Sequence, residues 1–230
     1  MSLGRRALLT AGATALAATV VPTSARAATA AEPASPTTYA EAIRELQRGN
    51  HRFVTGHTRH PHQGVAAIHR LAAAQDPFTV VLGCADSRTP SEILFDQGLG
   101  DIFDNRVAGN IVDDLLLGSI EYAVEHFEPP LLLVLGHERC GAISATVDIL
   151  QNGGEAPGHI AAIVEALTPI IEPVLDQPGD PVENGVLANV RAQVAALSAQ
   201  SEIVREKVAA GKLRIAGGRY DLDTGHFTLV

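Results

Sequence analysis

Two short segments of the chain hold residue types that can bind a metal ion, and each directly follows an apolar stretch. Cys84 comes after "FTVVLG" and precedes Asp86 and Arg88 at alternate positions. His137 and Cys140 come after "LLLVLG" and are three residues apart. Two thiolates and one imidazole form a ligand set that suits Zn²⁺, and a catalytic zinc site keeps its fourth position for water or substrate.

Both apolar stretches predict short buried strands, over residues 78–84 and 131–136. In open α/β sheets, sites form outside the carboxyl ends of strands, so the two segments are expected to meet there. At a strand-to-helix turn, side chains three residues apart can face one point. The alternative is a disulfide, because these are the only two cysteines in the chain and an exported protein favours their pairing.

The segments "CADSR" and "GHERC" resemble the C-x-D-x-R and H-x-x-C zinc motifs of the β-class carbonic anhydrases. Gln75 stands nine residues before the first cysteine, and "GDIFDNRVAGNIV" and "GSIEYAV" are similar to further family segments. The resemblance spans residues 39–220 and favours a metal over a disulfide. It implies one Zn²⁺ per subunit on Cys84, His137 and Cys140. It also implies reversible hydration of carbon dioxide to bicarbonate and a proton by a zinc-bound hydroxide.

The same resemblance implies roles for five more residues. Asp86 would be a fourth zinc ligand in a closed, inactive state, or would pair with Arg88 in an open state and accept a hydrogen bond from the hydroxide. Gln75 would donate an amide hydrogen bond to the substrate across a dimer interface. Phe103 and Tyr122 would line an apolar substrate pocket, although their residue types alone favour an ordinary place in the core.

Three positions depart from the family pattern. Val81 stands where some bacterial members have a tryptophan that helps to hold a non-catalytic bicarbonate, and Val107 and Gly109 stand where many have Asn and Ala. Two other functions stay open at this point. A relative with the same fold could hydrolyse carbon disulfide or carbonyl sulfide. A non-catalytic zinc module would have Asp86 permanently closing the site.

The first 27 residues have the pattern of an export signal. Arg5 and Arg6 precede an apolar run from Ala7 to Val21, "ARA" ends the segment, and it contains no acidic residue. We expect a cleaved signal at 1–27, a flexible tail at 28–37 and one catalytic domain at 38–230. The arginine pair favours the twin-arginine route, in which folding and metal loading precede export to the periplasm or the medium. A general secretory signal and a retained membrane helix are the alternatives.

Apolar periodicity predicts a single α/β domain with a mainly parallel central sheet flanked by helices. Glycines and prolines mark the ends of the predicted elements. Gly49 is expected to stop the first helix, with a short continuation after it. Pro129-Pro130 is expected to stop the third helix. The predicted helices cover residues 39–48, 65–74, 112–127, 140–150, 160–171 and 182–209. Besides the two buried strands, we expect a brief strand at 102–103 and a C-terminal pair joined by a turn at 223–225.

Composition and pattern also suggest which partners to expect. A net charge of −9 and the absence of tryptophan argue against a nucleic-acid partner, and no membrane partner is expected after signal cleavage. The helix at 39–48 is expected to find few partners in its own unit, and the resemblance implies that it wraps a neighbouring subunit of a homodimer or homotetramer. Five of the nine histidines fall within residues 51–69. For this segment we favour a solvated loop over a second metal site, with one of the histidines as a proton shuttle.

Overall fold

The structure is a computed structural model that describes residues 34–230. Residues Ser35–Val230 form one compact unit. The predicted export signal at 1–27 and most of the predicted tail lie outside the described residues. Among residues 34–230, no helix combines the length and the apolar character that a membrane crossing needs.

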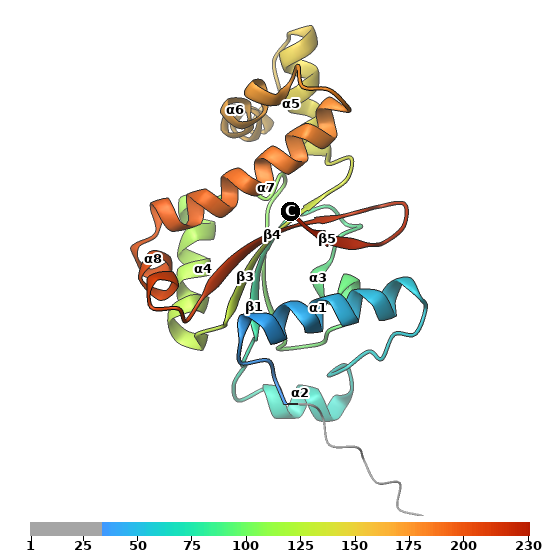
Figure 1. The fold of residues 1–230 in the computed structure, drawn as a ribbon, viewed down its shortest axis with the longest axis vertical. Coiled ribbons are helices and arrows are strands. Elements are labelled where there is room, and N and C mark those ends of the chain that lie inside the picture. Colours follow the sequence, from blue (N-terminus) through green and yellow to red (C-terminus); the bar gives the residue numbers. More distant parts are fainter. Residues whose placement is uncertain (1–33) are drawn as a thin grey trace, which may run out of the picture. The chain divides into compact units, whose positions relative to one another are not determined.

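The centre of the unit is a five-stranded sheet with the order β2-β1-β3-β4-β5 (Figure 1). The first four strands are parallel, and the last pairs antiparallel with β4. This confirms the predicted α/β fold with a mainly parallel sheet. The strands are β1 (Thr79–Gly83), β2 (Ile102–Arg106), β3 (Leu131–His137), β4 (Arg214–Tyr220) and β5 (Phe227–Leu229).

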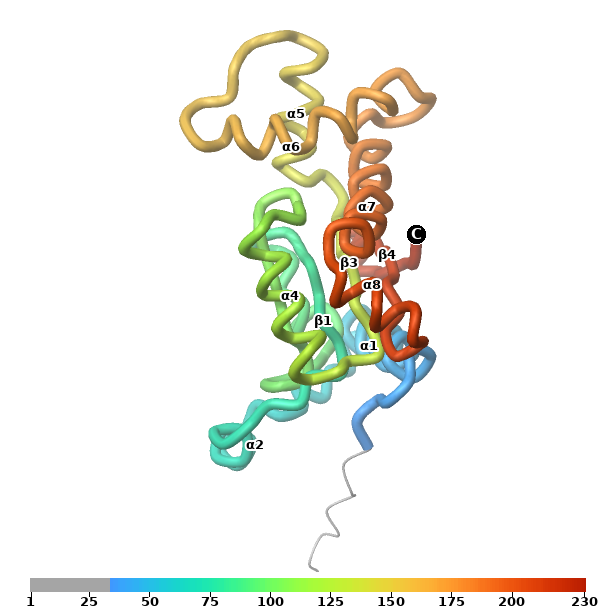
Figure 2. The backbone as a smooth tube through the Cα atoms, turned by 90° about the vertical axis from the view of Figure 1, so that its left-hand side faces the viewer, coloured from blue at the N-terminus to red at the C-terminus, as the bar shows by residue number. Residues whose placement is uncertain are grey.

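Helices cover both faces of the sheet. Helices α1 and α3 lie on one face, while α4, α7 and α8 cover the other, and α5 and α6 pack against α7 beyond the carboxyl ends of the strands (Figures 1 and 2). The helices are α1 (Tyr39–Val54), α2 (Val65–Leu71), α3 (Ser91–Leu94), α4 (Asp114–Phe127), α5 (Gly141–Asn152), α6 (Ile160–Ile171), α7 (Pro181–Gln200) and α8 (Glu202–Ala209). A short 3₁₀ turn, Glu172–Val174, follows α6.

Strands β1 and β3 are almost entirely apolar because both of their faces are buried. Successive side chains of a strand point to opposite faces. Val81 therefore packs in the cluster under α1, while Val80 and Leu82 pack in the cluster under α4 and α7. The whole of β3 is buried in the same alternating way. This two-sided burial fixes the positions of the residues that follow each strand.

Two predictions about the first helix are wrong. Gly49 does not stop α1, which continues to Val54. An added Cβ at Gly49 would lie 1.6 Å from the carbonyl oxygen of Phe95, so the glycine permits close packing of the helix on the segment after α3. The helix also has partners in its own chain, because Ala42 and Leu46 are fully buried against the sheet. Without α1, one face of this parallel sheet would be exposed to water, and α1 covers that face.

Other helix and strand boundaries differ from the predicted ones for local structural reasons. The helix predicted over 182–209 breaks at Ser201, which has an extended backbone and accepts a hydrogen bond from the backbone N–H of Val204 as the N-cap of α8. The four-residue α3 was not predicted, since it is too short to show a periodic pattern. The second helix ends at Leu71 rather than at residue 74, and the short strand predicted at 102–103 runs on to Arg106.

Candidate metal centre

The three predicted metal ligands meet at the carboxyl ends of β1 and β3. Cys84 directly follows β1, His137 is the last residue of β3, and Cys140 is the N-cap residue of α5. One potential ligand atom from each lies within 4.8 Å of the other two, and all three residues are buried. They meet because β1 and β3 are neighbouring parallel strands. The sulfur atoms are 4.0 Å apart, about twice a disulfide bond length, and both cysteines are free.

The hydrogen bonds around the imidazole fit a metal ligand. His137 Nδ1 lies 2.9 Å from the backbone carbonyl oxygen of Glu138, and only a protonated Nδ1 can donate to that oxygen. A neutral ring then keeps its lone pair on Nε2, which is buried without a hydrogen-bond partner in the described residues. A buried polar atom without a partner is costly, and a bound Zn²⁺ would remove that cost. The donor set and its orientation therefore fit zinc.

The surroundings of the sulfurs favour a thiolate, which is the form that binds zinc. Hydrogen bonds from the Cys140 thiol and from the backbone N–H of Gly109 lower the pKa of the Cys84 thiol. The pKa of Cys140 is raised, because this thiol donates to the Cys84 sulfur and is itself buried. A divalent cation bound by both sulfurs would displace the remaining thiol proton.

Asp86 and Arg88 form a bidentate pair beside the ligands. Arg88 Nε donates to Asp86 Oδ1 at 2.9 Å, and Arg88 Nη2 donates to Oδ2 at 2.7 Å. The backbone N–H of Arg88 adds a third bond to Oδ1 at 2.9 Å. These contacts, the side-chain ones first, hold the pKa of the Asp86 carboxyl well below its usual range. Both carboxylate oxygens are engaged by arginine, which is the arrangement predicted for the open state.

Arg106 is a residue of the site that the sequence reasoning missed. It ends β2, next to β1, and its Nε donates to the backbone carbonyl of Cys84 at 2.9 Å. Its Nη2 donates to the carbonyl of Asp86 at 2.5 Å. One guanidinium thereby fixes the backbone on both sides of Ala85. The sequence signal for this residue is the arginine of the segment "GDIFDNRVAGN".

The remaining predicted residues lie away from this centre. Gln75 is exposed in the loop before β1, so the full strand, about 16 Å long, separates it from Cys84. Phe103 is the second residue of β2, and its ring centroid is 6.3 Å from that of Tyr122 on α4. Tyr122 is 49% exposed. The structure therefore brings the metal ligands to the Asp86–Arg88 pair, and it does not bring Gln75, Phe103 or Tyr122 to the site of their own chain.

Known proteins are similar to this chain over most of its length. The sequence model of the family described as "Carbonic anhydrase" matches residues 79–227. "Carbonic anhydrase 2" of Mycobacterium tuberculosis is 42% identical over 188 residues, which are 82% of this chain and 91% of the relative. "Carbonic anhydrase" of Mycolicibacterium smegmatis is 43% identical with the same coverage.

Solved structures give the same picture. A Coccomyxa β-carbonic anhydrase in complex with acetazolamide has a TM-score of 0.62 and 29% identity, and the match covers 70% of this chain and 75% of that one. A tetrameric β-carbonic anhydrase from Sordaria macrospora has a TM-score of 0.65 and 25% identity, with 84% and 95% covered.

Proposed function

Since this chain belongs to the β-class carbonic anhydrases, we propose that it hydrates carbon dioxide reversibly with one Zn²⁺ held by Cys84, His137 and Cys140. The observation that carries the zinc assignment is the meeting of these three buried side chains around an unpartnered imidazole nitrogen. Zinc bound there would supply the Lewis acidity that makes water a nucleophile near neutral pH.

The residues beside the metal would prepare the nucleophile. Asp86, held by Arg88, would accept a hydrogen bond from the attacking oxygen and so orient its lone pair toward carbon dioxide. An ionised carboxylate is needed for this, and the Asp86–Arg88 pair keeps it ionised. Arg106 holds the backbone that carries Cys84 and Asp86. The same pair argues against a non-catalytic module that Asp86 permanently closes.

We propose further that the active unit is at least a dimer. Gln75, Phe103 and Tyr122 lie away from the metal centre of their own chain, and β2 is an edge strand of the sheet. A second subunit packed on that edge would receive Gln75 as an amide donor and the two aromatic rings as an apolar pocket wall. Light scattering would test this, and a monomer at micromolar concentration would contradict it.

Export by the twin-arginine route is also a proposal, and it rests on residues 1–27 alone. Zinc loading before export would protect Cys84 and Cys140 from pairing in an oxidising compartment. The mass of the protein recovered from outside the cytoplasm would test the predicted cleavage after Ala27. Protein found only in the cytoplasm at its full mass would contradict export.

Metal dependence tests the catalytic proposal. Wild-type protein should contain one zinc per chain, lose carbon dioxide hydration when a chelator removes the metal, and recover it when zinc is restored. His137→Ala should lose both zinc and activity. His159→Ala is the matched control, because His159 is exposed and its side chain makes no cap hydrogen bond. Full activity in zinc-free protein would contradict the proposal.

A further inference from the structure

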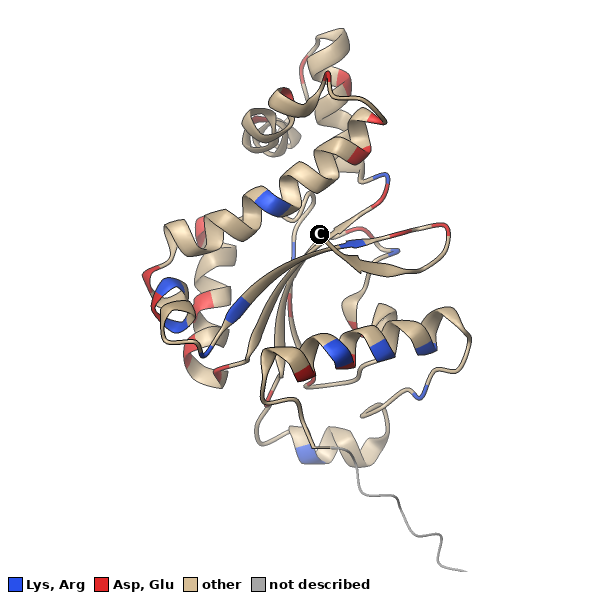
Figure 3. Ribbon diagram, viewed as in Figure 1, with Lys and Arg blue, Asp and Glu red and all other residues tan. Residues whose placement is uncertain are grey.

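A hollow of about 500 Å³ on α1 is lined by basic and amide side chains. Three of its arginines are spaced by four residues, which puts them on one face of the helix. Figure 3 shows basic residues in a row along α1. The lining residues are Arg44, Gln47, Arg48, His51, Arg52 and Arg59.

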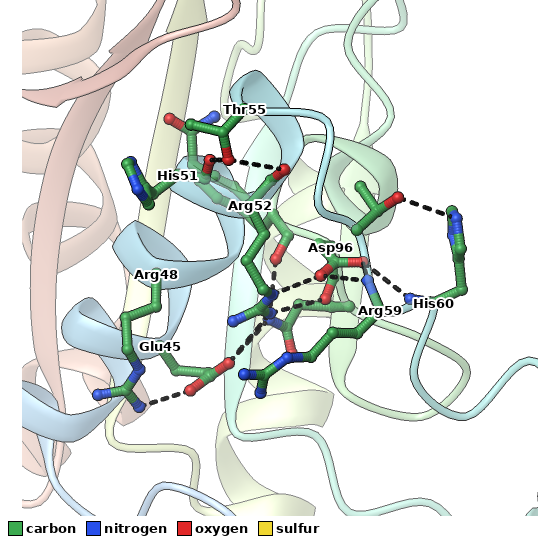
Figure 4. A network of polar contacts seen from close by, with 12 residues as sticks. Glu45, Arg48, His51, Arg52, Thr55, Arg59, His60 and Asp96 are labelled. Atoms are coloured by element: carbon green, nitrogen blue, oxygen red, sulfur yellow. Dashed lines mark hydrogen bonds and ion pairs between the residues drawn. The ribbon is translucent and has the colours of Figure 1, made fainter.

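A buried carboxylate organises one side of the hollow. The Asp96 side chain is 1% exposed and accepts a hydrogen bond from Arg52 Nε at 2.5 Å. It also accepts the backbone N–H groups of Arg59 and His60, both at 3.0 Å (Figure 4). These bonds hold the loop that carries Arg59 beside α1. The charge of Asp96 balances that of Arg52 and does not neutralise Arg44 or Arg59 at the surface.

Positive charge at the hollow exceeds negative charge. Glu45 accepts from Arg48 at 2.5 Å and, more weakly, from Arg52 at 3.4 Å. Within residues 34–230, the guanidinium groups of Arg44 and Arg59 form neither a hydrogen bond nor an ion pair with another side chain. Four arginines against two carboxylates leave an excess of two positive charges, although the whole chain carries −9. Such local segregation of charge is typical of a surface that attracts an anion.

We propose that this hollow binds a dianion of the phosphate class. A guanidinium presents parallel N–H donors that match two oxygens of a phosphate, and two guanidinium groups without partners are available. The excess of two positive charges matches a phosphate dianion better than the singly charged bicarbonate. The volume admits a group larger than inorganic phosphate, so a diphosphate or a phosphate ester also fits. This site is separate from the metal centre and is not needed for carbon dioxide hydration.

Calorimetric titration of the zinc-loaded protein with inorganic phosphate and with pyrophosphate tests the proposal. Binding should saturate and should weaken as salt is added, because the pairs are exposed to solvent. The double variant Arg44→Gln, Arg59→Gln should bind at least about tenfold more weakly, since it loses charge-assisted hydrogen bonds. Arg191→Gln is the matched control, because Arg191 is exposed on α7, across the sheet.

Glu45 gives a test of opposite sign. Its carboxylate competes with an anion for Arg48 and Arg52, so Glu45→Gln should tighten phosphate binding. Equal affinity in the double variant and in Arg191→Gln would place the phosphate elsewhere, the metal included, and would overturn the proposal. Absence of saturable heat in wild type, or weaker binding in Glu45→Gln, would overturn it as well. Circular dichroism would confirm that each variant is folded.

Discussion

Asp104 is predicted to make the protein less stable as the pH rises from about 4 to about 6. Its side chain is 12% exposed on β2, and burial, followed by the nearby charge of Glu92, raises the pKa of its carboxyl to about 6. Ser91 Oγ donates to it at 3.1 Å, but Arg106 Nε is 4.0 Å away. The nearest cation therefore compensates only weakly for the burial.

The raised pKa sets the sign and the size of the effect. The folded carboxyl keeps its proton to a higher pH than the unfolded one, whose pKa is 3.8, so the unfolded state binds fewer protons in this range. The free energy of unfolding then falls as the pH rises and is constant above the folded pKa. The folded and unfolded pKa values of Asp104 differ by about two units. At about 1.4 kcal/mol per unit, the free energy of unfolding falls by up to about 3 kcal/mol.

Denaturant unfolding of Asp104→Asn across pH 4 to 8 measures this loss. The neutral amide keeps an oxygen for Ser91 but has no charge to bury, so the variant should be about 2 to 3 kcal/mol more stable than wild type at pH 7.5 and equal to it near pH 4. Asp176→Asn is the control, because Asp176 is exposed to solvent. Both variants share the pH dependence of zinc binding, so the difference between their unfolding free energies does not contain it. Equal pH slopes for the two variants would contradict a raised pKa for Asp104.

Three further substitutions, the last with a matched control, test the site and the fold. Arg106→Gln removes two charge-assisted hydrogen bonds, so denaturant unfolding should show a loss of about 2 to 3 kcal/mol and metal analysis a lower zinc affinity; wild-type values would contradict its positioning role. Arg88→Gln frees Asp86 to approach the metal, so hydration at pH 7 should fall at least about tenfold with zinc content unchanged, and full activity would argue against the pair. Gly49→Ala forces a Cβ against a carbonyl oxygen and should lower the free energy of unfolding by about 3 kcal/mol. Gly118→Ala, with open space on α4, is its control and should be neutral or slightly stabilising in the same unfolding assay.

The metal centre could be predicted because it depends on the strongest patterns in the sequence. Two largely apolar stretches give buried neighbouring strands, and the residues that follow such strands must meet at one edge of the sheet. Cys84, His137 and Cys140 stand at those ends. The spacing within each segment then determines which side chains converge. The alternation of strands and helices also has a strong apolar pattern, and it predicted the α/β class.

The features that were missed depend on contacts between distant segments. Gly49 lies within α1 because Phe95, 46 positions later, packs against it. Asp96 meets Arg52 and Arg59 only in the folded chain, so the hollow on α1 has no local signal. Arg106 reaches the metal loop through the register of β2 on β1. The roles of Gln75, Phe103 and Tyr122 depend on a second subunit and stay predictions.

The most direct test of the account is stopped-flow carbon dioxide hydration by the zinc-loaded protein at neutral and at alkaline pH. Because Arg88 engages both carboxylate oxygens of Asp86, this carboxylate would not bind the metal, and activity is expected at both pH values. Activity only at alkaline pH would contradict the open arrangement and would place Asp86 on the metal. No activity at either pH, with zinc bound, would contradict carbon dioxide hydration itself.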